Sequence, residues 1–143
     1  MANGYCQKDG LMWQHHIFLI TVAMEASKYI TAIAHPFEAV CCPYDKTILI
    51  DMISDDTFKR LFDATAEKGI AVEINVHSMH TKTKEQIENC AQMRMFRLAK
   101  ECGCKFIFGS DAHDNEQHSS YENATVVSEL LELNETNIAD IAL

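Results

Sequence analysis

The chain has 143 residues, enough for one domain, and 48% of them are hydrophobic, enough to form a buried core. Its 12 Lys and Arg residues against 21 Asp and Glu residues give a formal net charge of -9. That charge repels nucleic-acid backbones and anionic membranes, so we expect neither nucleic-acid binding nor membrane association. A small phosphate ester is still compatible with a local metal site, because bound cations reverse the local field.

The N-terminal sequence and the cysteines favour an intracellular protein. MANGYCQKDG lacks the basic segment and the long apolar run of a secretion signal, and the most apolar stretch, residues 17–24, is too short to cross a bilayer. The six cysteines do not have the spacing of a four-thiolate zinc site. We therefore expect reduced thiols that mostly fill the core of a cytoplasmic protein.

Helical and extended patterns alternate along the chain, without a linker or a repeat. In chain order, the predicted elements are a helix over residues 16–27, a strand over 29–36, a helix over 55–68, a strand over 70–77, a helix over 84–102, a strand over 105–108, a helix over 121–133 and a short final helix or frayed end over 134–143. This alternation is typical of an α/β protein with a parallel sheet covered by helices, either doubly wound or part of a βα barrel.

Local end signals support the two central helices. Ser54 or Asp55 can cap the helix over residues 55–68, and Gly69 stands where a C-cap glycine closes such a helix. Thr83 and Gln86 have the spacing of a capping box at the start of the next helix.

Polar side chains gather at the ends of the three predicted strands. The first strand ends in His35, the second in Asn75, and the third in Asp111 and His113. Because the carboxyl ends of parallel strands meet at one rim, we expect these side chains to converge. Asp111 and His113 are two residues apart in an extended segment, so both side chains can face one metal cluster. A carboxylate with neutral imidazoles suits Zn, Mn or Fe better than Mg alone.

Each of these residues also has a structural interpretation. Asp111 can cap the following helix, His113 can be a solvated loop residue, and His35 can donate a hydrogen bond at a strand end. Glu73 lies inside its strand and is interpreted as a structural residue that points to the core or to a helix layer. Asn75, at the strand tip, is the better contact for a ligand.

Three ordered motifs, AIAHPF, GIAVEIN and IFGSDAH, resemble the later motifs of the PHP (polymerase and histidinol phosphatase) superfamily. The resemblance covers roughly residues 29–133 and is closest to stand-alone metal-dependent phosphoesterases, including histidinol-phosphatase-like proteins. It implies part of a distorted (β/α)7 TIM-like barrel with two or three divalent ions, Zn, Mn or Fe, at the C-terminal rim. It also implies hydrolysis of phosphate esters by a metal-activated hydroxide.

The resemblance assigns roles to four residues. Carried over by motif, His35, Asp111 and His113 would be metal ligands, and Asn75 would be a substrate-binding residue of the pocket. Asp111 and His113 are also the expected catalytic residues, because a His or Asp at the rim can assist proton transfer. The expected partner is a small phosphorylated substrate.

The family's earlier motifs are missing from the sequence. An N-terminal His-x-His strand, a second motif ending in Asp-His and a mid-chain Glu ligand are not found. We therefore expect residues 1–143 to form a single PHP-like domain that lacks the N-terminal half of the barrel. Three ligands shared by several ions predict weak metal affinity and low activity of this chain alone. Open sheet edges predict a homo-oligomer or pairing with the missing half.

Two alternatives remain open. The chain can be a non-catalytic interaction or regulatory module that keeps the PHP fold, which the missing ligands favour. It can also be an accessory domain of a DNA polymerase, which the acidic charge disfavours.

Overall fold

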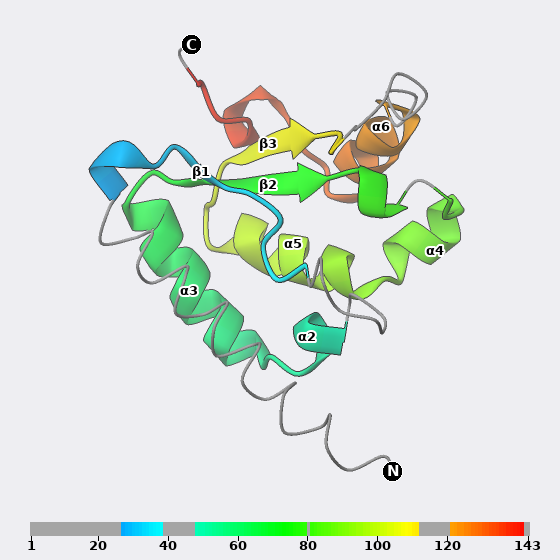
Figure 1. Ribbon diagram of the computed structural model, residues 1–143, viewed down its shortest axis with the longest axis horizontal. Helices are drawn as coiled ribbons and strands as arrows, with labels where there is room; N and C mark the ends of the chain where they lie inside the picture. Colours follow the sequence, from blue (N-terminus) through cyan, green and yellow to red (C-terminus); the bar gives the residue numbers. More distant parts are fainter. Residues whose placement is uncertain (1–26, 39–47, 80, 112–120, 142–143) are drawn as a thin grey trace.

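The computed structural model describes residues 27–38, 48–79, 81–111 and 121–141. Helices and strands alternate along these segments (Figure 1). In chain order they are η1 (Ser27–Tyr29), β1 (Ala32–Ile33), α2 (Ile48–Asp51), α3 (Asp55–Glu67), β2 (Ala71–Asn75), η2 (His77–Met79), α4 (Lys84–Glu88), α5 (Ala91–Glu101), β3 (Phe106–Gly109), α6 (Tyr121–Leu130) and η4 (Glu135–Asn137), where η denotes a 3-10 helix.

The strands form a parallel three-stranded sheet in the order β1-β2-β3. Ala32 pairs with Ala71, Val72 with Phe106, and Asn75 with Gly109. The predicted α/β class with parallel strands and covering helices is thereby confirmed. Because all three strands run in one direction, their carboxyl ends lie at one edge of the sheet (Figure 1).

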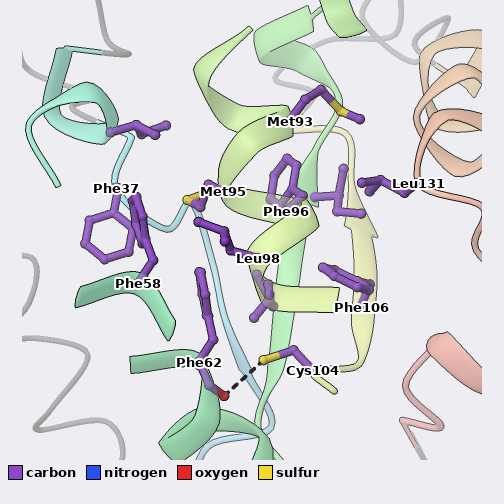
Figure 2. Close-up of a cluster of buried hydrophobic side chains, with 14 of the residues drawn as sticks. Phe37, Phe58, Phe62, Met93, Met95, Phe96, Leu98, Cys104, Phe106 and Leu131 are labelled. Atoms are coloured by element: carbon purple, nitrogen blue, oxygen red, sulfur yellow. Dashed lines mark hydrogen bonds between the residues drawn. The ribbon is translucent and has the colours of Figure 1, made fainter. Parts of the chain in front are cut away.

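One face of the sheet packs on α3 and α5. Val72, Ile74 and Phe106 belong to the same buried apolar cluster as Phe62 of α3 and Phe96 of α5. The Phe96 and Phe106 rings meet edge to face, with centroids 6.4 Å apart (Figure 2). Burial of these large side chains is the main favourable contribution to stability.

The predicted end signals of the central helices are confirmed. Ser54 Oγ accepts a hydrogen bond from the Thr57 N–H at 3.3 Å, which caps α3. Gly69 follows α3 with φ +67°, a conformation that glycine adopts without steric cost. Thr83 and Gln86 form a complete capping box at the start of α4.

The single helix predicted over residues 84–102 is wrong, because the structure has two helices there, α4 and α5. Asn89 Nδ2 donates to the Glu85 carbonyl at 2.8 Å, and Cys90 has the extended angles φ -80° and ψ 156°. The extended backbone at Cys90 ends α4 and makes Cys90 the N-cap residue of α5, so a second helix starts there.

The C-terminal part also differs in detail from the prediction. Helix α6 ends at Leu130, before the predicted residue 133, and Glu132 has a positive φ of 50° just beyond it. The segment after η4 returns to the sheet, where the Ala139 N–H donates to the Phe106 carbonyl at 2.9 Å. The helix predicted over residues 16–27 lies almost wholly outside the described residues. None of the described helices combines the length and apolar character that a membrane span requires.

Candidate functional site

The carboxyl end of the sheet brings together two of the predicted metal ligands. His35 follows β1 and Asp111 follows β3, and the His35 Nε2 lies 3.8 Å from the Asp111 Oδ1. Their side chains are 31% and 34% exposed, so a ligand can reach both. His113, the third predicted ligand, lies outside the described residues. Asn75 ends β2 between them and is buried, and its predicted contact with a substrate stays a prediction.

Glu73 holds the backbone of His35. Its Oε2 accepts a hydrogen bond from the His35 N–H at 2.8 Å and lies 3.5 Å from the His35 Nδ1. Gly109 makes room for this carboxylate, because a Cβ at Gly109 would lie 1.8 Å from the Glu73 Oε1. Glu73 was expected to be a structural residue, and its contact with His35 is not evident from the sequence. The sequence does contain one indication of it, because Glu73 is two residues before Asn75 and therefore lies on the same face of β2.

Asn75 hydrogen-bonds to the segment after β1, which carries His35 and Glu38, and to the start of η2. Its Nδ2 lies 2.8 Å from the His35 Nδ1 and donates to the Glu38 Oε2 at 3.2 Å. Its Oδ1 accepts a hydrogen bond from the His77 N–H at 3.0 Å. Three carboxylates thus surround the imidazole, with Glu38 and Glu73 near Nδ1 and Asp111 near Nε2.

The backbone at this rim is in the left-handed region. His35 and Asp111 both have φ 47°, and Phe37 has φ 61°. A residue with a side chain pays about 1–3 kcal/mol for such a conformation, which persists only where surrounding contacts impose it. Strained residues of this kind cluster at functional sites, so the angles at His35 and Asp111 favour a functional role for the rim.

The chemistry of the donor pair fits one divalent ion. An imidazole nitrogen and a carboxylate oxygen 3.8 Å apart could both hold the same ion, and both are ligand types that divalent transition metals accept. Within the described segments, no group of three or more His, Cys, Asp and Glu side chains is arranged to hold a metal. His35 and Asp111 would therefore need a further ligand, and His113 is the one that the resemblance implies.

No family model, curated protein or solved structure matches the chain. The resemblance of its three motifs to the PHP superfamily therefore stays a prediction.

Proposed function

We propose that the rim binds a divalent metal ion through His35 and Asp111 and that the chain is a PHP-type metal-dependent phosphoesterase module. The observation that carries the proposal is the 3.8 Å separation between the His35 Nε2 and the Asp111 Oδ1. These residues are 76 positions apart in the chain, and two accessible donors of the predicted types meet where the strands end. His113 completes the ligand set in this proposal.

The residues of the chain have distinct parts in the proposed reaction. A bound ion would supply Lewis acidity toward a phosphoryl group and toward the attacking water. His35 and Asp111 would hold it, and Glu73 fixes the His35 backbone by accepting a 2.8 Å hydrogen bond from its N–H. Asp111 or His113 assists proton transfer to the leaving oxygen. Zn, Mn and Fe match this donor set, and the substrate is a small phosphate ester.

The proposal also includes the barrel fold and the assembly of the chain with a second copy or a separate barrel half. The three-stranded sheet is a portion of a distorted (β/α)7 barrel in this interpretation, and a second copy or a separate barrel half pairs with it. With few protein ligands for each ion, we expect weak metal binding and low turnover by this chain alone. Size-exclusion chromatography with light scattering tests the assembly, and a stable monomer at tens of micromolar would contradict it.

Metal titration and phosphatase assays test the proposed activity. We expect the chain to bind Zn²⁺ or Mn²⁺ and to hydrolyse an aryl phosphate slowly, and His35→Gln and Asp111→Asn each to weaken metal binding at least about tenfold. Asp56→Asn is the control, because Asp56 is exposed in the first turn of α3.

The possible results separate the candidate functions. Metal binding with turnover that Asp111→Asn abolishes supports the phosphoesterase. Metal binding without turnover upholds the metal centre and overturns the catalytic part. Neither binding nor turnover overturns the proposal and favours the non-catalytic interaction or regulatory module.

A further inference from the structure

The orientation of the Asn75 amide is determined by two neighbours that cannot exchange their hydrogen-bonding roles. The backbone N–H of His77 can only donate, so the atom 3.0 Å from it is the Asn75 Oδ1. The Glu38 carboxylate accepts, so the atom 3.2 Å from its Oε2 is the Asn75 Nδ2. Asn75 therefore presents its NH₂ group to the His35 Nδ1.

The short distance between Asn75 and His35 then determines which imidazole nitrogen carries the proton. The Asn75 Nδ2 lies 2.8 Å from the His35 Nδ1, and two N–H groups cannot face each other at that distance. An amide NH₂ has no acceptor capacity, so the His35 Nδ1 must accept. We infer that Asn75 holds neutral His35 in the tautomer with the hydrogen on Nε2, which faces Asp111.

Neither nearby carboxylate lies close enough to the His35 Nδ1 to accept a good hydrogen bond from a proton on that nitrogen. The Glu73 Oε2 and the Glu38 Oε2 lie 3.5 Å and 3.9 Å from the His35 Nδ1, at or beyond the limit of a hydrogen bond. The Glu73 Oε2 already accepts the His35 backbone N–H at 2.8 Å. Asn75 cannot move away easily, because it is 2% exposed and lies in the middle strand of the sheet.

This tautomer makes Asn75 a positioning residue that opposes metal binding. In the proposed function, on which this step rests, His35 uses Nε2 as a metal ligand, and a neutral imidazole binds a metal through a nitrogen without a proton. The ring proton would then have to be on Nδ1, where it faces the Asn75 NH₂ group unless the ring rotates toward the Glu73 Oε2, 3.5 Å away. Asn75 thereby lowers the metal affinity of His35 and supplies a second reason for weak binding.

Nitrogen NMR of the full chain without metal tests the tautomer directly. Two-bond ¹⁵N–¹H correlation spectra distinguish the two tautomers, and the His35→Gln variant identifies the His35 signals. In spectra recorded at a pH at which the ring is observed to be neutral, we expect a protonated Nε2 and an unprotonated Nδ1. A neutral ring with its proton on Nδ1 would overturn the inference.

An exchange of two side chains reverses the hydrogen bond without changing the net charge. In the double variant Glu38→Gln, Asn75→Asp, residue 75 still accepts from the His77 N–H and now accepts from the position 38 amide. It presents a carboxylate oxygen to the His35 Nδ1, so we expect the tautomer to invert. Glu38→Gln alone keeps the Asn75 donor and is the matched control, with the original tautomer.

Measurement of Zn²⁺ affinity then tests whether the His35 tautomer affects metal binding. We expect the double variant to bind Zn²⁺ at least about tenfold more tightly than the Glu38→Gln control. An unchanged tautomer in a folded double variant would overturn the inference. An inverted tautomer without tighter Zn²⁺ binding would uphold the tautomer and overturn the role of Nε2 as a metal ligand. If the double variant does not fold, the NMR result on the original chain still decides the tautomer.

Discussion

The two faces of β2 have similar burial and opposite chemistry. All five residues of the strand are buried. Val72 and Ile74 point into the apolar cluster with α3 and α5, whereas Glu73 and Asn75 lie on the other face with His35. Apolar contacts tolerate small shifts, but each buried polar atom needs a partner in a defined direction. The comparison shows that burial alone does not distinguish a core residue from a site residue.

The largest expected effect is on the apolar face. Phe96 is 1% exposed and packs on Phe106, so Phe96→Ala should lower the free energy of unfolding by about 3–5 kcal/mol. Chemical denaturation measures the change. Glu67→Ala, at an exposed position of α3, is the control and should change stability by less than about 0.5 kcal/mol. Equal effects of the two variants would show that the apolar face does not dominate stability.

The next effect is on the polar face, at Gly109. Gly109→Ala should cost about 1–3 kcal/mol, because the new Cβ would collide with the Glu73 Oε1. In the Glu73→Ala background the same substitution should cost at least about 1 kcal/mol less. Denaturation of the four chains of this double-mutant cycle measures the coupling. Additive costs would mean that Gly109 does not serve to accommodate Glu73.

The apolar cluster also contains a titratable group, the Cys104 thiol. Burial, with smaller contributions from Cys102 and Asp63, raises the pKa of the Cys104 thiol from 9.0 to about 12. Between these values the unfolded chain has lost the proton and the folded chain has kept it, so the unfolded chain binds fewer protons. The stabilisation is therefore complete below about pH 9 and is lost as the pH rises toward 12.

Denaturation under reducing conditions at several pH values measures this loss. The contribution of Cys104 should not exceed about 1.4 kcal/mol per pH unit, the limit for one proton. Cys104→Ala should make the decline above pH 9 shallower and leave the slope between pH 7 and 8 unchanged. Parallel curves for the two chains would show that Cys104 ionises as easily in the folded chain as in the unfolded one.

The smallest expected effect is at the surface between α4 and α6. Lys84 Nζ lies 2.9 Å from Glu129 Oε2, with both side chains more than half exposed. Lys84→Met should change the free energy of unfolding by no more than about 0.5 kcal/mol, because water and salt screen an exposed ion pair. Denaturation at low and high salt checks this. A loss of more than about 1 kcal/mol would exceed the usual contribution of an exposed ion pair and would indicate a more specific role for Lys84 and Glu129.

The sequence alone determined the features that depend on neighbours along the chain. The alternation of apolar patterns predicted a parallel α/β sheet, and Ser54, Gly69 and the Thr83–Gln86 pair marked helix ends correctly. These signals are local, since a cap or a strand pattern acts within a few residues. The break between α4 and α5 escaped prediction, because no Gly or Pro marks it and Cys90, the N-cap residue of α5, makes no side-chain cap hydrogen bond.

Only the tertiary structure decided how the rim is built. The sequence placed His35, Asn75 and Asp111 at strand ends, but the bond from His35 to Glu73 spans 38 positions and the space for Glu73 comes from Gly109 on another strand. Strand register, rather than local sequence, sets both contacts, whereas the Asn75 amide is oriented by the His77 N–H two residues on and by the distant Glu38 carboxylate. Hydrogen bonds act over about 3 Å, so the roles of these polar side chains emerge only when distant segments are brought together.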